Sequence, residues 1–158
     1  MTSIDLEILN VVRNAFRDAR RPSRFTIEDG DPECMEHDRM WKSKTPETLI
    51  FEDVFPDDMF PCNELLAEGL AWFFPAIVRI VLESDDRQSN GEWCGMALAL
   101  SLLGKSPNHF LDWCGPEQRQ AVARLLRHLL STRRHLFDTP ADMNQFRAVS
   151  ELWDRSIR

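Results

Sequence analysis

Apolar residues recur at spacings of three and four in several stretches of the chain, which is the period of an amphipathic α-helix. Residues 3–19 show this spacing first, with Thr2 or Ser3 available as the N-cap and Pro22 available to stop the helix. The apolar positions of this segment are Ile4, Ile8, Val11, Val12, Ala15, Phe16 and Ala19. The pattern therefore predicts an N-terminal helix with one buried face.

A second stretch, residues 63–82, has apolar side chains on all sides, which predicts a helix at the centre of the domain. Asn63 can cap this helix, and Pro75 either kinks it or divides it into two helices. The stretch also contains Glu68 and Arg79. Each of these charges would cost about 2.5–3.5 kcal/mol at bilayer depth, so a buried core helix is favoured over a membrane span.

Start signals predict further helices in the second half of the chain. Residues 89–92 have capping-box spacing ahead of an apolar run, and residues 107–113 have the pattern of a short helix. Pro116 suits the first position of a longer helix, and residues 139–142 open the last one. These segments predict a mainly α fold, with residues 1–158 forming a single compact domain of five to six helices.

Residues 22–62 have a different pattern, because six prolines and glycines interrupt them. Two short β-rich runs, 24–28 and 48–52, form either a small strand pair or extended chain packed on helices. Residues 35–41 could form one or two helical turns. We expect this segment to be irregular for most of its length.

Acidic side chains are concentrated in the same region. Residues 28–58 hold eleven acidic and three basic residues, a net charge of −8 in a chain whose formal net charge is −7. Such a segment is either a solvated face or a docking surface for a basic partner, since charged surfaces speed and select association. We expect Trp41 to be partly exposed there and to anchor a partner. The predicted partner-binding residues are Glu28, Asp29, Asp31, Glu33, Glu36, Asp38, Trp41, Glu52, Asp53, Asp57 and Asp58.

Composition and cysteine use predict a soluble cytoplasmic protein. A hydrophobic fraction of 43% over 158 residues is too high for a disordered chain. The first residues include acids where a secretory signal would carry lysine or arginine. The cysteines are Cys34, Cys62, Cys94 and Cys114, which are far apart and are expected to be reduced thiols.

The sequence contains only one of the two ligand pairs that a structural zinc site needs. Cys34 and His37 have ligand spacing, but a structural zinc ion needs a second pair, and none of the other cysteines has a close partner. No nucleotide-binding or metalloprotease motif occurs either. We therefore expect no metal, no cofactor and no catalytic residue that a motif identifies.

An enzyme assembled from sequence-distant residues remains an alternative. Cys114 lies near a predicted helix start with His109 five residues earlier, an arrangement that could lower the pKa of a thiol. Glu64 and Glu68 share a face of the predicted helix and could act as paired carboxylates. A buried inert cysteine and solvated acids are the commoner roles of such residues.

A second alternative is weak binding of nucleic acid or another anion. Basic side chains of residues 124–135 lie away from the leucine face of their predicted helix: Arg124, Arg127, His128, Arg134 and His135. This basic ridge has no interleaved aromatic residues for base stacking, and the chain as a whole is acidic. A solvated helix face is therefore the favoured interpretation, and we do not expect nucleic acid as the partner.

The run Gly69-Leu-Ala-Trp-Phe-Phe-Pro-Ala76 resembles a bacterial family of small uncharacterised helical proteins. The early helix with Ala15-Phe16, the lone Trp41 and the helix from Pro116 follow in the same order as in that family, over about residues 8–130. The resemblance implies a helical fold and a bacterial cytoplasmic protein. The family has no assigned activity to carry over.

Taken together, these features favour a non-enzymatic cytoplasmic binding protein that acts by contact with another protein. A specific form of this hypothesis is an immunity protein that neutralises a basic toxin, because the chain is small and acidic and lacks an active-site motif. A membrane partner is not expected, and the pattern leaves the oligomeric state open.

Overall fold

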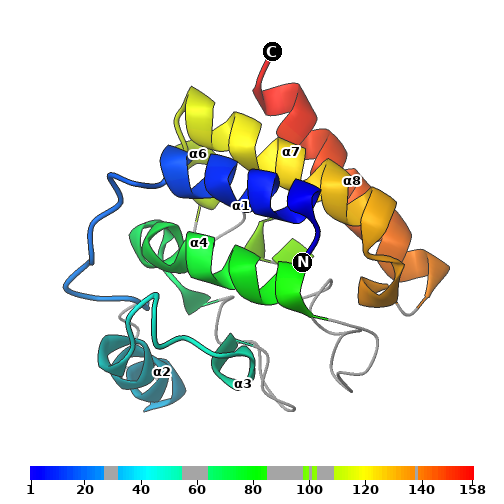
Figure 1. The fold of residues 1–158 in the computed structure, drawn as a ribbon. Helices are drawn as coiled ribbons and strands as arrows, with labels where there is room; N and C mark the ends of the chain where they lie inside the picture. The colour runs from blue at the N-terminus through cyan, green and yellow to red at the C-terminus, as the bar shows by residue number, and fades with distance from the viewer. Residues whose placement is uncertain (27–31, 55–63, 85–97, 100, 103–108, 138) are drawn as a thin grey trace.

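The fold, taken from a computed structural model, is mainly α-helical, which confirms the fold class predicted from the apolar spacing (Figure 1). The structure describes residues 1–26, 32–54, 64–84, 98–99, 101–102, 109–137 and 139–158. Within these ranges the longer helices are α1 (Ser3–Ala15), α2 (Pro32–Ser43), α4 (Ala67–Glu83), α7 (Pro116–Thr132) and α8 (Pro140–Ser156). The shorter ones are α3 (Phe51–Val54), α6 (Phe110–Trp113) and the 3-10 helix η2 (Arg134–Leu136).

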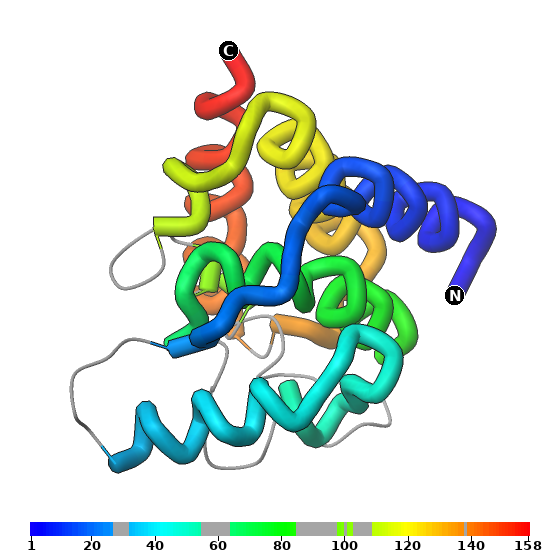
Figure 2. The backbone as a smooth tube through the Cα atoms, turned by 90° about the vertical axis from the view of Figure 1, so that its left-hand side faces the viewer, coloured from blue at the N-terminus to red at the C-terminus, as the bar shows by residue number. Residues whose placement is uncertain are grey.

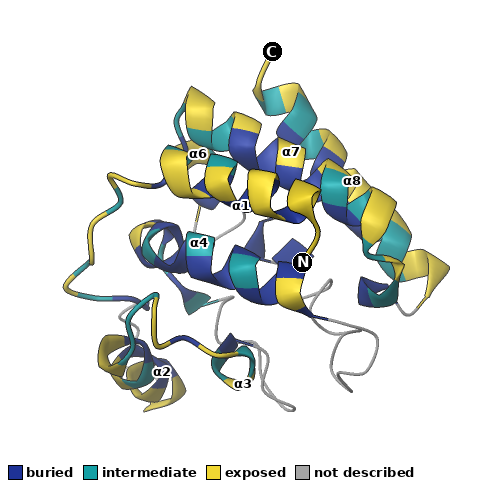
Figure 3. Cartoon of the chain, viewed as in Figure 1, coloured by how far each residue is buried: buried dark blue, intermediate teal, exposed yellow. Residues whose placement is uncertain are grey.

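Helix α4 lies in the middle of the molecule, as its apolar composition predicts. Figures 1 and 2 show α1, α7 and α8 on one side of it and α2 with α3 on the other. Twelve of the seventeen residues of α4 are buried, because both layers cover it (Figure 3). The helix runs through Pro75 without a break, so this proline lies inside one helix and does not separate two.

Three helix starts follow the predicted chemistry. Thr2 and Thr139 each form a capping box, in which the threonine side chain accepts from the backbone three residues later and an aspartate side chain accepts in return. Pro116 occupies the first turn of α7, where its missing N–H costs nothing. The first helix ends at Ala15, four residues before the predicted end at residue 19.

The segment predicted to be irregular contains a three-turn helix, so that expectation was wrong for residues 32–43, which form α2. The predicted strand pair is also absent among the described residues: Thr26 forms an isolated bridge with Leu65, and residues 51–54 are helical. The backbone carbonyl of Phe25 accepts from the N–H of Leu66 at 2.7 Å. The extended run around Phe25 is therefore paired with the chain that leads into α4.

Gly69 allows this pairing, because a Cβ atom there would lie only 3.1 Å from Cδ1 and 3.2 Å from the carbonyl oxygen of Phe25. Phe25 itself is fully buried and packs against Phe73 of α4, with ring centroids 5.4 Å apart. The close approach brings residues 25–26 against the start of α4. The predicted cap Asn63 and the predicted helix start at residues 89–92 lie outside the described residues.

Candidate functional site

Helix α2 and the one-turn helix α3 carry most of the described acidic residues of the 28–58 segment, and internal contacts fix the position of α2. Trp41 is completely buried and lies 5.1 Å from Phe73 of α4 between ring centroids. The Thr26 hydroxyl donates to the carbonyl of Cys34 at 2.9 Å. One side of α2 is thus held against α4 and residues 25–26, and the other side faces solvent (Figure 3).

The structure corrects the expectation for Trp41. We expected a partly exposed anchor, but the indole is covered by α4, and its Nε1 has no hydrogen-bond partner within the described residues. The physical reason is that the segment folds as a helix, so Trp41 shares a face with the buried Cys34, His37 and Asp38. Trp41 therefore stabilises the fold and is not available to a partner.

Asp38 is also an internal residue and does not belong to the exposed surface. Its carboxylate accepts from the backbone N–H of Phe25 at 2.8 Å and of Thr26 at 3.4 Å, and it pairs with Lys42 at 2.5 Å. Burial raises the pKa of Asp38, but Lys42 and the two backbone donors outweigh this effect and hold the pKa below its usual range. The ionised carboxylate therefore fixes residues 25–26 to α2.

Among the predicted partner-binding residues, those that remain exposed lie on α2 and α3. Glu33, Glu36 and Glu52 are exposed, while Asp53 is half-buried and pairs with Lys44 at 2.7 Å. Two large apolar residues stand close to them in sequence, Met35 with 47% and Ile50 with 53% of their surface exposed. We refer to Glu33, Met35, Glu36, Ile50 and Glu52 as the α2–α3 face. The other predicted partner-binding residues, Glu28, Asp29, Asp31, Asp57 and Asp58, lie outside the described residues.

In the candidate metal-ligand pair of Cys34 and His37, the histidine contacts a glutamate that the sequence pattern does not indicate. His37 Nδ1 lies 2.5 Å from Oε2 of Glu64, and both His37 and Cys34 are buried. No group of three or more side chains suited to hold a metal ion occurs among the residues that the structure describes. The partly buried pair of His37 and Glu64 connects α2 to the chain just before α4.

The candidate residues for an enzyme are not brought together. Cys114 is buried, and burial raises the pKa of its thiol to about 12 against a smaller opposing effect of Arg119. His109 is exposed and adopts a left-handed backbone conformation with φ of 45° at the start of α6. Glu64 precedes α4 and so does not share a helical face with the exposed Glu68, which corrects the predicted carboxylate pair.

Three of the five residues of the basic ridge form ion pairs with other helices. Arg124 pairs with Glu7 of α1, and Arg127 lies 3.7 Å from Asp154 of α8. His128 Nε2 lies 2.7 Å from Asp5. The ridge is therefore mainly the seam between α7 and its neighbours, which weakens its interpretation as an anion-binding face.

Asp5 is the centre of a buried charge cluster that the sequence analysis did not identify. Its carboxylate is completely buried, accepts from His128 and lies 2.7 Å from Nη2 of Arg133, whose other contact is the carbonyl of Leu82 at 3.2 Å. Burial raises the pKa of Asp5, but the backbone N–H of Thr2, His128 and Arg133 together hold it well below its usual range. The cluster joins α1, α7 and the end of α4.

None of the helices within the described ranges is both long and apolar enough to cross a bilayer. Comparison with family models, with curated proteins and with solved structures finds no match to this chain. The family resemblance around residues 69–76 therefore stays a prediction, and the function has to be argued from the residues themselves.

Proposed function

We propose that this protein is a non-enzymatic binding protein that acts through contact with another protein, and that the α2–α3 face is the contact surface. The observation that carries the proposal is the combination of exposed glutamates with the exposed side chains of Met35 and Ile50 on this layer. Methionine and aromatic residues are enriched in the cores of protein interfaces, and charged residues at the rim set specificity.

The use of the other polar groups supports this choice of surface. Asp5, Asp38, His37 and His128 are all committed to internal ion pairs or hydrogen bonds. By contrast, Glu36 and Glu52 have exposed side chains, and their helices are fixed on α4 by buried residues such as Trp41. A surface that is held rigidly before binding loses little conformational entropy when a partner docks.

The charge of the surface favours a basic partner, because an acidic face attracts positive surfaces and repels other acidic ones. A cytoplasmic immunity protein that neutralises a basic toxin is the specific form of the proposal. It would cover the toxin's basic substrate-binding surface with the α2–α3 face. A toxin reading frame beside the gene would support this form.

The test compares two triple variants with the same change in net charge. The first replaces Glu33, Glu36 and Glu52 with lysine on the α2–α3 face. The matched control replaces three exposed acids on α6, α7 and α8 with lysine, namely Asp112, Glu117 and Glu151. Partners are captured by cross-linking in cells that carry the gene, and each candidate is then titrated as a purified protein against all three forms of the chain.

The proposal expects a partner whose affinity falls by at least about tenfold with the first variant and stays within about threefold with the control. It also expects the affinity to fall as salt rises, because exposed charges are screened. Equal losses in both variants, or no loss in either, would show that the partner does not use this face. A partner that is converted chemically during binding would overturn the non-enzymatic part.

A further inference from the structure

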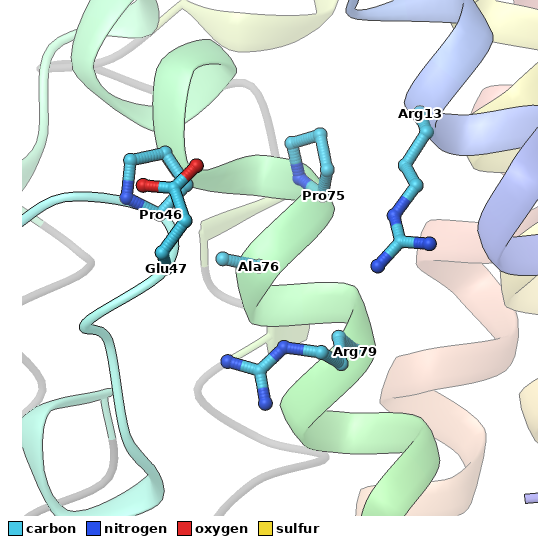
Figure 4. A pocket seen from close by; sticks show the side chains of 6 residues that line it. All are labelled: Arg13, Pro46, Glu47, Pro75, Ala76 and Arg79. Carbon is cyan, nitrogen blue, oxygen red and sulfur yellow. The ribbon is translucent and has the colours of Figure 1, made fainter.

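A concave surface is lined by residues of α1, α4 and the 44–50 segment. Helix α4 forms its floor at Pro75 and Ala76, α1 contributes Arg13, and the 44–50 segment contributes Pro46 and Glu47 (Figure 4). Arg79, one turn further along α4, completes the lining. The pocket has a volume of about 370 Å³, which is within the range of small-molecule sites.

The two arginines of this pocket differ in how they are held. Arg79 donates to Glu83 at 3.0 Å and to the carbonyl of Leu49 at 2.9 Å, so its guanidinium is fixed and still has unused N–H groups. Arg13 is exposed and forms no ion pair or hydrogen bond with any residue that the structure describes. Arg79 is thus already paired within α4 and with the 44–50 segment, whereas Arg13 is available to a ligand.

Glu47 brings the opposite charge to the same pocket. Its side chain is exposed and lies on the wall across from Arg13, with Pro75 and Ala76 between them (Figure 4). Hydrogen bonds from the Thr45 side chain and from its own backbone lower the pKa of Glu47, so the carboxylate is charged at neutral pH. The pocket therefore has cationic groups on α1 and α4, an anionic group on the 44–50 segment and an apolar floor between them.

We propose that this pocket binds a small zwitterionic ligand of the amino-carboxylate class. The ligand's carboxylate is received by Arg13, because a guanidinium group matches a carboxylate in charge and geometry. Its ammonium group faces Glu47, and its aliphatic part lies on Pro46, Pro75 and Ala76. A ligand with only one of the two charges would leave either Arg13 or Glu47 without a ligand group of opposite charge.

The test titrates the purified chain with three probes of similar length: 5-aminopentanoate, pentanoate and pentylamine. Binding is followed by amide chemical shifts in a labelled sample, up to about 10 mM of each probe, which detects dissociation constants in the millimolar range. We expect the zwitterion to bind at least about fivefold more tightly than either singly charged probe, with shifts centred on residues 75–79 and 46–47.

Two variants and two controls decide which groups take part. Arg13→Gln should weaken the binding of 5-aminopentanoate and pentanoate. Glu47→Gln should weaken the binding of 5-aminopentanoate and pentylamine, and remove the advantage of 5-aminopentanoate over pentanoate. The controls are Arg17→Gln, two residues past the end of α1 and outside this pocket, and Glu68→Gln, in the first turn of α4. Both controls should bind all probes as the unmodified chain does.

Three results would overturn the proposal. The first is no shift at the pocket with any probe, and the second is equal affinity for the zwitterion and pentanoate in the unmodified chain. The third is binding that survives Arg13→Gln unchanged. Folding of each variant is checked by circular dichroism, so that a loss of binding is not a loss of structure. The pocket shares no residue with the α2–α3 face, so its failure leaves the proposed protein contact untouched.

Discussion

Replacing Asp5 with asparagine tests the buried charge cluster that holds α1 on α7. The substitution keeps the shape of the side chain but removes the negative charge that faces His128 and Arg133. A matched control is Asp18→Asn, because Asp18 is an aspartate close to the end of α1 whose side chain is 93% exposed. The two variants change the net charge equally and differ in burial.

The expected magnitude follows from the burial of all three groups. The Asp5 side chain is 0% exposed, and those of His128 and Arg133 are 8% and 13% exposed. Removing one member of a buried ion pair costs about 3–5 kcal/mol, because the remaining charge stays buried without a partner. Arg133 can turn part of its guanidinium to solvent, so we expect about 3 kcal/mol for Asp5→Asn. Asp18→Asn should change stability by less than about 0.5 kcal/mol.

Urea unfolding followed by tryptophan fluorescence and circular dichroism measures both effects. With a urea dependence of about 1–3 kcal/mol per molar, a loss of 3 kcal/mol moves the unfolding midpoint down by at least about 1 M. The difference in unfolding free energy between the unmodified chain and Asp5→Asn should also depend on pH. Because the pKa of Asp5 is lowered in the folded state, its contribution is complete above the unfolded pKa near 4 and is lost as the pH falls below it.

The stability gap between the unmodified chain and Asp5→Asn should therefore narrow between about pH 5 and pH 2. A destabilisation of Asp5→Asn that is no larger than that of the control would refute the reasoning. So would a gap that stays constant over this pH range, because it would show that the charge of Asp5 is not what the cluster uses.

Three further predictions concern the core and the thiols. Trp41→Ala should lower the free energy of unfolding by about 3–5 kcal/mol in thermal or urea unfolding, as expected for a fully buried aromatic residue. If Trp41 were an exposed anchor, the same substitution would lower it by less than about 1 kcal/mol. Gly69→Ala should lower the free energy of unfolding by about 1 kcal/mol, although alanine has the better helix propensity. The reason is that the added Cβ atom would crowd the carbonyl of Phe25, which is held by a hydrogen bond and cannot withdraw. A variant that is more stable than the unmodified chain would contradict this close approach. Cys114 should react with iodoacetamide at pH 8 at least about 100-fold more slowly in the folded chain than in urea, because its raised pKa leaves little thiolate. Peptide mass spectrometry measures both rates. Comparable rates in the folded and unfolded chain would refute the burial of this thiol.

Local signals in the sequence were sufficient for the helix starts. Thr2, Pro116 and Thr139 each act within one turn of their own position, so the residue type and its spacing already specify the cap. The central position of α4 was also predictable, since apolar residues surround it on all sides. These features depend on contacts that are close in sequence or on composition alone.

The face of α2 could not be predicted in the same way. Its buried side includes His37 and Asp38, and polar residues are expected at the surface unless a partner is known. Their partners are Glu64 and the backbone of residues 25–26, which are 12 to 27 positions away. No local pattern indicates such pairs, so Trp41 was assigned to the wrong side of the segment. The Asp5 cluster was missed for the same reason, because His128 and Arg133 lie in the last third of the chain.

The large sequence separation between α1 and its packing partner α7 has a consequence for protein synthesis. The carboxylate of Asp5 is separated by 123 residues from the imidazole that it meets. A ribosome therefore has to produce most of the protein before the first helix can bury its acid and its apolar side. Until α7 has been synthesised, the face of α1 that packs on it stays exposed, and chaperones that bind nascent amphipathic segments can reach this face. Shortening the gene just before the codon for Pro116, which removes α7 and His128, should give a product that stays bound to such chaperones, whereas removal of residues 157–158 should not.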